Sequence, residues 1–154
     1  MTQGELHTLI LGLKSDLTIR EAASPLAIKV TPEYFMSLMT ILHRDPRFAF
    51  DQLQLHSALD WPTENRIECL YLLNSTTQNH EVIISVSLDR KNPLLPSVSE
   101  LWAIAEWQER EVYDMFGVLY ENHPDLRRLL LDDDWQGFPL RKDYEDDFML
   151  RRPW

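Results

Sequence analysis

The chain has 154 residues, of which 44% are hydrophobic and 26% are charged, a composition typical of one globular domain. Its net charge of −10 argues against binding to duplex DNA or anionic lipid, because both require a basic surface. The single cysteine, Cys69, excludes a disulfide within the chain, and also an iron–sulfur cluster or zinc site held by cysteines of this chain alone. No apolar run approaches the roughly 20 residues of a membrane span.

The first 45 residues predict a helix, two short strands and a second helix. Apolar residues near the N-terminus follow helical spacing, namely Leu6, Leu9, Ile10 and Leu13. Gly12 weakens the end of that helix, and residues 17–22 and 26–30 have the composition of strands. Thr31 is followed by proline and glutamate, which predicts a capped helix start, and the helix should end by Asp45.

Three strand patterns follow the second helix. Apolar residues alternate from position 48 to 61 but change parity near Asp51-Gln52, where we expect a β-bulge or a strand break. Phe48 and Phe50 precede this point, and Leu53, Leu55, Leu59 and Trp61 follow it. Residues 66–74 are apolar on both parities, as in a central strand, and residues 81–89 alternate. The polar residues 75–80 predict the hairpin loop between these two strands.

A long helix is expected next, followed by an irregular tail. Ser97 and Glu100 form a capping-box pattern, the helix should run to about Phe116, and Gly117 should stop it. The order α-β-β-α-β-β-β-α predicts an α+β fold, a two-layer domain of helices on a mixed sheet. We therefore divide the chain into an α+β core domain, residues 1–117, and an extended partner-binding tail, residues 118–154.

Charged residues are concentrated in the last predicted helix. Glu109 and Glu111 lie two positions apart and so point to opposite sides, whereas Arg110 can form ion pairs at i, i+4 with Glu106 and Asp114. Apolar residues occupy nearly all sides of the same helix, namely Trp102, Trp107, Tyr113 and Phe116. A helix of this kind is covered on more than one face, so we expect these charged groups to be buried and paired.

Support for catalysis within the chain is weak. No two of the five histidines are three or four residues apart, the spacing of metal ligands on a helix. The four glycines do not form the sequence motif of a dinucleotide-binding or phosphate-binding loop. One enzymatic hypothesis remains open, a stand-alone acid–base enzyme that uses His123 with Glu111 or Asp114. No pocket-forming loop accompanies these groups.

The tail favours an interface instead. It carries two basic clusters, Arg127-Arg128 and Arg141-Lys142, in an otherwise acidic region. It also carries apolar anchors that are too numerous for a disordered segment, namely Trp135, Phe138, Leu140, Tyr144 and Phe148. Arginine together with aromatic residues is typical of protein–protein interfaces.

Three stretches of the sequence form a distinctive set of motifs: EREVYDMFG (109–117), HPDLRRLLLDDDW (123–135) and GFPLRKDYE (137–145). In order and spacing they resemble the signature of the thirty-kilodalton subunit family of respiratory complex I (NADH:quinone oxidoreductase). Phe138 stands where many members have histidine, and this departure leaves packing as its expected role.

The resemblance implies a non-catalytic scaffold subunit in the hydrophilic arm of a proton-translocating NADH:quinone oxidoreductase, where it would assemble the quinone-reducing module. It implies no cofactor bound by this chain, with FMN, iron–sulfur clusters and quinone in partner subunits. The chief partner would be the quinone-site subunit that resembles a hydrogenase large subunit. The chain would be peripheral, on the cytoplasmic face of the inner (plasma) membrane. An equivalent subunit of a related membrane-bound hydrogenase or dehydrogenase, with another electron donor, is the alternative.

The resemblance assigns no catalytic residue. The residues it assigns to partner binding or to the structural motif are Glu109, Arg110, Glu111, Asp114, Phe116, Gly117, His123, Pro124, Arg127, Arg128, Gly137, Pro139, Leu140, Arg141, Lys142 and Asp143.

Overall fold

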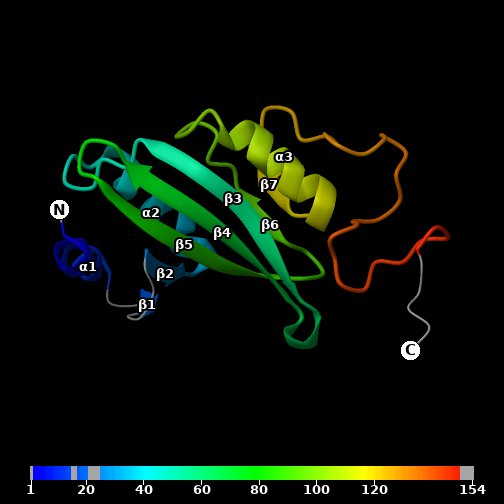
Figure 1. Ribbon diagram of the computed structural model, residues 1–154, viewed down its shortest axis with the longest axis horizontal. Coiled ribbons are helices and arrows are strands. Elements are labelled where there is room, and N and C mark those ends of the chain that lie inside the picture. The colour runs from blue at the N-terminus through cyan, green and yellow to red at the C-terminus, as the bar shows by residue number, and fades with distance from the viewer. Residues whose placement is uncertain (1, 15–16, 21–24, 150–154) are drawn as a thin grey trace.

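The structure is a computed structural model that describes residues 2–14, 17–20 and 25–149. Its elements follow the predicted order and add a short 3₁₀ helix and two short strands (Figure 1). They are α1 Gln3–Leu11, β1 Thr18–Arg20, β2 Leu26–Val30, α2 Pro32–Arg44, β3 Gln52–Trp61, η1 Pro62–Glu64, β4 Arg66–Ser75, β5 His80–Asp89, β6 Leu94–Pro96, α3 Ala105–Phe116 and β7 Leu119–Glu121. The α+β class is confirmed. Of the first predicted strand, residues 21 and 22 lie outside the described part of the chain.

The main sheet is mixed, as predicted, with strand order β1-β2-β5-β4-β3. Strands β2 and β5 run parallel, whereas β1–β2, β3–β4 and β4–β5 are antiparallel. The prediction of a central strand for residues 66–74 is confirmed, because β4 lies between β3 and β5. A separate two-stranded sheet joins β6 and β7 in parallel.

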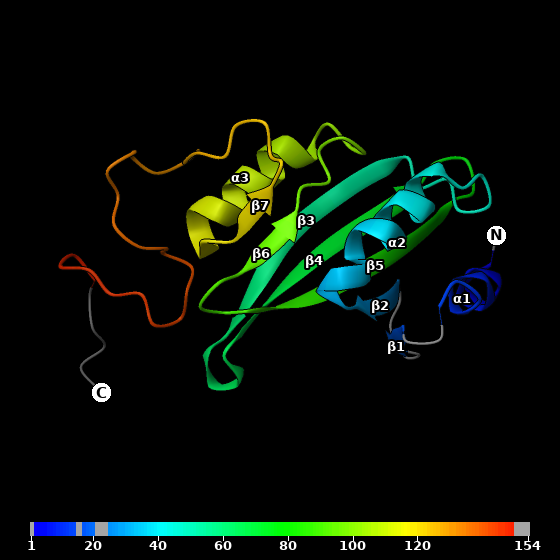
Figure 2. The same ribbon diagram turned by 180° about the vertical axis from the view of Figure 1, so that it is seen from behind.

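Helices α2 and α3 cover the same face of the sheet. Figure 2 shows both in front of the strands, whereas the face toward the viewer in Figure 1 has no helix over β4 or β5. On the covered face, the rings of Phe35 in α2 and Tyr71 in β4 lie 5.1 Å apart between centroids. Tyr71 stacks on His56 of β3, whose Nε2 lies 2.5 Å from the hydroxyl of Tyr120 in β7. The core therefore lies between the sheet, α2 and the α3–β7 segment.

The segment after α2 differs from the prediction. Phe48 and Phe50 are fully buried, but Phe48 belongs to a turn and Phe50 to an irregular stretch, and neither lies in a strand. The amide of Phe48 donates to the carbonyl of Asp45 at 3.0 Å, and Ala49 adopts a positive φ of 48°. The irregularity in the β3–β4 pairing lies between Leu53 and Leu55 and not at Asp51-Gln52.

This bulge reverses the side-chain pattern of β3. Leu53 is 4% exposed, whereas Leu55 is 53% exposed, and Leu59 also lies on the uncovered face. His56, Ala58 and Asp60 point into the covered face instead. The one-residue shift therefore exchanges which parity is buried, because the side-chain period of a strand is two.

One predicted helix start is wrong, and one predicted cap lacks its hydrogen bond. The last helix begins at Ala105 and not at Ser97, because residues 94–96 form β6 and residues 98–104 form turns. The hydroxyl of Ser97 donates to Glu109, at 2.6 Å, and forms no capping box with Glu100. Thr31 occupies the N-cap of α2, but its side chain makes no capping hydrogen bond. Gly117 ends α3 in the left-handed region, with φ of 77°, as predicted.

The bulge gives a direct stability test. Leu53→Ala should lower the free energy of unfolding by about 2–4 kcal/mol, because it leaves a cavity in the core. Leu55→Ala should change it by about 0.5 kcal/mol or less, because its side chain lies on the uncovered face. Urea unfolding of both variants is the measurement, and equal losses would mean that the two side chains share one face.

Candidate functional site

The charged residues of α3 divide into buried and exposed groups. Glu109, Arg110 and Asp114 are buried, whereas Glu111 is exposed. The burial expected from the apolar surroundings is thus confirmed for these three residues, and it is wrong for Glu111. The partners of these buried groups differ from the predicted ones. The groups bind segments before and after the helix and do not pair with each other at i, i+4.

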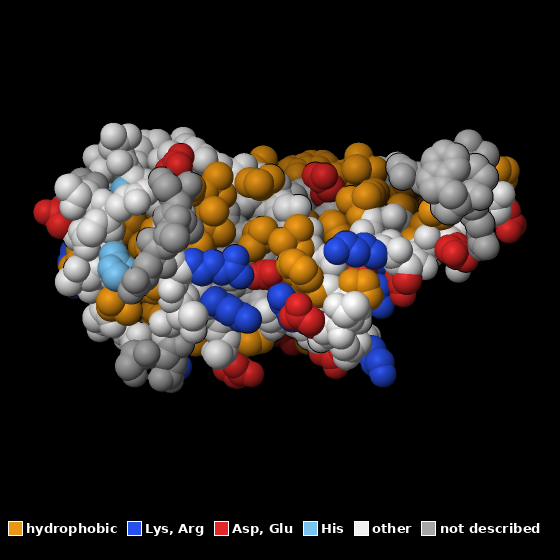
Figure 3. All heavy atoms as spheres, turned by 60° about the horizontal axis from the view of Figure 1, so that its bottom comes forward, with side chains coloured by type: hydrophobic (Ala, Val, Ile, Leu, Met, Phe, Trp, Pro, Cys, Tyr) orange, Lys and Arg blue, Asp and Glu red, His pale blue; other side chains and the backbone are white. Residues whose placement is uncertain are grey.

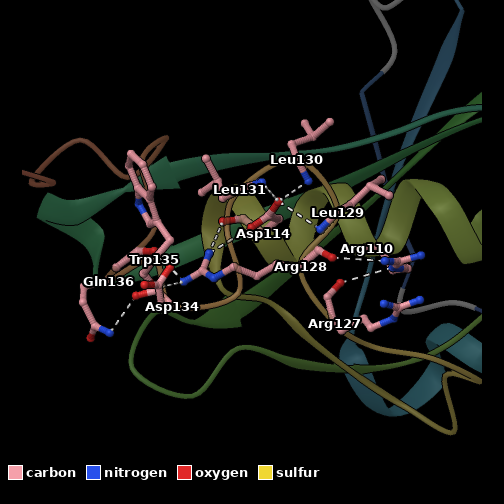
Figure 4. A network of polar contacts seen from close by, with 11 residues as sticks. Arg110, Asp114, Arg127, Arg128, Leu129, Leu130, Leu131, Asp134, Trp135 and Gln136 are labelled. Carbon is pink, nitrogen blue, oxygen red and sulfur yellow. Dashed lines mark hydrogen bonds and ion pairs between the residues drawn. The ribbon is translucent and has the colours of Figure 1, made fainter.

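Asp114 holds the tail to the end of α3 (Figure 4). Its Oδ2 accepts hydrogen bonds from three successive amides, those of Leu129 at 3.1 Å, Leu130 at 2.7 Å and Leu131 at 3.0 Å. Its Oδ1 accepts from Nη1 of Arg128 at 2.9 Å. One carboxylate therefore fixes the backbone path of residues 128–131.

Burial alone would raise the pKa of Asp114, but Arg128 and the three amides favour the charged form, and together they hold this pKa below its usual value. The carboxylate therefore stays charged at neutral pH although its side chain is fully buried.

Arg128 extends the same network to the second half of the tail. Its Nη1 also donates to the carbonyl oxygen of Asp114 at 3.1 Å. Its Nη2 donates to the carbonyl oxygens of Trp135 and Gly137, both at 2.9 Å. The planar guanidinium thus binds acceptors from three separate backbone positions, which a lysine could not do with one ammonium group.

Arg110 fixes the tail from the side of α3. Its Nε donates to the carbonyl oxygen of Arg127 at 3.2 Å, and its Nη2 donates to that of Arg128 at 3.0 Å. The guanidinium also lies 5.2 Å from the ring centroid of Trp107. The side chain of Arg127 itself points outward and pairs with Asp125 at 2.9 Å.

Glu109 connects three segments of the chain. Its Oε2 accepts from the hydroxyl of Ser97 at 2.6 Å, and its Oε1 accepts from the amide of Val98 at 2.8 Å. Nε2 of His123 lies 3.8 Å from Oε2, and both side chains are fully buried. Burial raises the pKa of Glu109 to about 7, although the hydrogen bonds from Ser97 and Val98 oppose the shift.

His123 lies beside Glu109, not in a dyad with Glu111 or Asp114. Its Nδ1 accepts from the amide of Asp125 at 3.0 Å, and its Nε2 lies 2.9 Å from the carbonyl oxygen of Glu106. These contacts fit the neutral imidazole that carries its proton on Nε2. Both ring nitrogens are thus engaged by the backbone, which does not favour the acid–base hypothesis.

The turn at Gly117 receives the second motif of the tail. A Cβ on Gly117 would lie 2.5 Å from the ring of Phe138, so only glycine fits both this φ and this contact. Nε of Arg141 donates to the carbonyl oxygen of Phe116 at 2.6 Å, and the amide of Leu140 donates to that of Met115 at 3.0 Å. Phe138 therefore packs as expected, and its ring also lies near the guanidinium of Arg141, at 5.2 Å.

A further ion-pair cluster, which no sequence pattern indicated, joins the tail to the sheet. Arg90 binds Asp60 at 2.6 Å and Asp143 at 2.7 Å, and the amide of Lys142 donates to Asp60 at 2.8 Å. The hydrogen bond from Arg90 lowers the pKa of Asp60 despite its burial. Asp143 was expected in the site, whereas Asp60 and Arg90 were missed because they lie far from the motifs in sequence. The side chain of Lys142 lies over the ring of Trp61 at 5.3 Å.

The remaining motif residues lie at turns of the tail. Gly137 has a positive φ of 83°, and a Cβ there would lie 3.0 Å from the ring of Tyr144. Pro124 and Leu140 are exposed, and Pro139 is half-buried. The partner-binding role of all sixteen residues stays a prediction, as does the boundary at residue 117. Directly after that boundary, β7 pairs with β6 and continues to pack on the core.

The described residues offer no cluster of three or more His, Cys, Asp or Glu side chains that could hold a metal ion. Cys69 is buried, and burial raises the pKa of its thiol. Within the described part of the chain, no helix is both long and apolar enough to cross a bilayer. Figure 3 shows basic and acidic side chains next to one another in the middle of the face it views.

Fold and site together define an α+β domain whose charged motif fastens its own C-terminal segment to the end of one helix. Residues 28–147 match the model of the family described as the respiratory-chain NADH dehydrogenase, 30 Kd subunit. The chain belongs to this family.

Curated relatives agree with this assignment. A subunit of the NADH-quinone oxidoreductase of Moorella thermoacetica is 42% identical over 129 residues, which cover 84% of this chain and 86% of the relative. The subunit of the same name from Chloroherpeton thalassium is 38% identical over 112 residues, or 72% of this chain and 46% of that relative. The subunit of the same name from Chlorobium phaeobacteroides is 44% identical over 101 residues, which cover 65% of this chain and 61% of that relative. The chain thus spans only about half to two thirds of the length of the latter two.

Two solved structures share the fold. The trypsin-resistant fragment (1–134) of Nqo5 is 27% identical with a TM-score of 0.70, and the match covers 81% of this chain and all of the fragment. A chain of the membrane-bound sulfane sulfur reductase, an archaeal respiratory membrane complex, has a TM-score of 0.79. It is 24% identical, and the match covers 92% of this chain and 85% of that chain, so this likeness concerns the fold alone.

Removing the charge of Asp114 should release the tail. Asp114→Asn breaks a buried ion pair, which typically costs roughly 3–5 kcal/mol, and it weakens the acceptor of three amides. Amide hydrogen exchange at Leu129–Leu131 should therefore become faster relative to the core strands. The matched control is Glu111→Gln, which removes one exposed charge from the same helix. Unchanged exchange at these amides in Asp114→Asn would refute the role of this carboxylate.

Glu109 should make stability depend on pH. Its folded-state pKa of about 7 lies above the ordinary value of 4.5, so the folded protein binds this proton more tightly than the unfolded chain. Its contribution to the free energy of unfolding is therefore largest below about pH 4.5 and is lost as the pH rises through about 7. Carbon-13 NMR titration of the carboxyl group measures the pKa, and Glu109→Gln should remove this part of the pH dependence. A midpoint near 4.5 would contradict the prediction.

Proposed function

We propose that this chain is a structural, non-catalytic subunit of a proton-translocating NADH:quinone oxidoreductase. In this role it helps to assemble the quinone-reducing module in the hydrophilic arm. The observation that carries the proposal is the family match over residues 28–147, which includes most of the core domain, most of the tail and all three motifs. Relatives named as a subunit of this oxidoreductase support it.

The use of the charged motif supports a structural role. Asp114, Arg110 and Arg128 direct their hydrogen bonds at backbone groups of the tail, and Glu109 binds the segment before α3. Groups engaged in this way hold a surface in shape and do not face a substrate. Such residues can be indispensable for an assembly, because breaking a buried ion pair costs a large part of the stability of a domain.

The proposal places all redox chemistry in partner subunits. FMN, the iron–sulfur clusters and the quinone site would belong to them, and the chief partner would be the quinone-site subunit that resembles a hydrogenase large subunit. The chain would then be a peripheral subunit on the cytoplasmic face of the membrane. The likeness in fold to a chain of the sulfane sulfur reductase complex supports a second candidate, the equivalent subunit of a complex with another electron donor or acceptor.

Replacing the chromosomal gene with tagged variants tests assembly and catalysis separately. Arg128→Lys keeps the charge but cannot bind the carbonyls of Asp114, Trp135 and Gly137 together, so the amount of intact complex in membranes should fall several-fold. Arg47→Lys is the matched control, because the Arg47 side chain is exposed, pairs with Asp45 two residues away and is not one of the motif residues.

Native gel electrophoresis measures the intact complex, and NADH:quinone turnover is then expressed per assembled complex. A scaffold role requires that Arg128→Lys lowers the amount of complex and leaves turnover per complex unchanged. Full assembly with lost turnover would show a catalytic role. Co-purification with subunits of a different oxidoreductase would favour the second candidate.

A further inference from the structure

The tail presents an acidic surface, although its sequence carries two basic clusters. Arg128 and Arg141 turn inward and bind backbone carbonyl oxygens, and Arg127 is neutralised by Asp125. Lys142 is the one member of the four whose side chain is exposed without a described carboxylate partner. The acidic side chains stay outside, namely Glu111 of α3 and Asp132, Asp133, Asp134, Asp143, Glu145 and Asp147 of the tail.

Two leucines of the tail are exposed, and Leu130 lies two residues before Asp132-Asp133-Asp134 in the chain. Leu130 is 64% exposed and Leu140 is 55% exposed. Both are held by their backbone amides at the last turn of α3, since Leu130 donates to Asp114 and Leu140 donates to Met115. Figure 4 shows the side chain of Leu130 directed away from α3.

These hydrogen bonds fix the backbone at Leu130 and Leu140, so that both side chains are held in solvent. Because Asp114 binds three successive amides, the side chain of Leu130 stays outside while Leu129 and Leu131 are half-buried. A side chain on a backbone that is already fixed costs no further backbone entropy when a partner covers it, and so more of its burial energy contributes to binding.

We propose that Leu130 and Leu140, together with the acidic residues Glu111, Asp132, Asp133 and Asp134, form a docking surface for another subunit, one that has an apolar pocket with a basic rim. We name it the leucine–acid surface. The inference rests on the proposed function and adds the chemistry of the partner to it. Charge complementarity is its argument, because acidic residues around apolar anchors favour lysine and arginine on the other side.

The same charges oppose other occupants. A second copy across a two-fold axis would place this acidic surface against itself, since such interfaces use the same patch on both chains. Anionic lipid and nucleic acid would also be repelled. Figure 3 shows acidic side chains (red) at the right-hand end, where the tail lies.

Site-specific cross-linking in the assembled complex tests the identity of the occupant. A photoreactive phenylalanine derivative replaces Leu130 or Leu140, and as a control it replaces Leu55, which is similarly exposed on the uncovered sheet face. After irradiation, mass spectrometry should find peptides of another subunit that are rich in lysine and arginine at positions 130 and 140. Cross-links to a second copy of this chain, to lipid or to an acidic peptide would overturn the proposal.

Substitution of the surface measures its contribution. Leu130→Ser and Leu140→Ser should each reduce the retention of the chain in the purified complex roughly tenfold, the effect of losing about 1.4 kcal/mol of apolar burial. Leu55→Ser should leave retention unchanged. Asp132→Asn/Asp133→Asn should weaken retention and reduce its dependence on salt, whereas the control Glu33→Gln/Glu100→Gln, which also removes two exposed charges, should do neither.

The two proposals fail in different ways. If the tagged wild-type chain does not purify with other subunits of an oxidoreductase, the proposed function is wrong. If it does, but the leucine and aspartate variants are retained like wild type, only the leucine–acid surface is wrong. Circular dichroism of each variant establishes that it is folded, and one that is unfolded is replaced by Leu130→Gln or Leu140→Gln in the same measurement.

Discussion

The buried pair of Asp114 and Arg128 is the interaction on which the arrangement of the tail depends. The carboxylate has three amides and one guanidinium as donors, and the guanidinium binds three carbonyl oxygens as well. A buried charge is tolerated only when its hydrogen-bonding capacity is satisfied, and here the partners are mostly backbone groups. The pair therefore holds a chain segment that, in the described residues after β7, has no helix or strand of its own.

The same principle accounts for the many charged residues of the motif. An irregular segment leaves its backbone donors and acceptors without the partners that helices and sheets provide, and these groups still need hydrogen bonds when they are covered. Arg110, Arg128 and Arg141 supply donors to carbonyls, and Asp114 supplies an acceptor to amides. Basic residues are thereby used inside the molecule, which leaves acids and leucines on the outside of the tail.

Local patterns were sufficient for most elements. The helix over 32–44, the hairpin of β4 and β5 and the glycine stop of α3 follow from proline at the first helical position, alternation and the conformational freedom of Gly117. The start of α3 was placed too early, because Ser97 and Glu100 have the spacing of a capping box but Glu109 binds the serine hydroxyl. Strand β6 was missed because its partner, β7, lies after the helix and only three residue pairs join the two.

The sequence by itself determined the α+β class, the family and the burial of charged residues in α3, because these depend on periodicity and on motifs that are continuous in the chain. Tertiary structure alone decided which groups those charges meet. Asp114 could equally have paired with Arg110 one turn away. Nothing in the sequence around Asp60 indicates that it binds Arg90 and the amide of Lys142. The bulge between Leu53 and Leu55 was likewise decided by pairing with β4. Such choices depend on competition between partners that are distant in sequence, and packing settles that competition because each buried charge must find all of its hydrogen bonds at once.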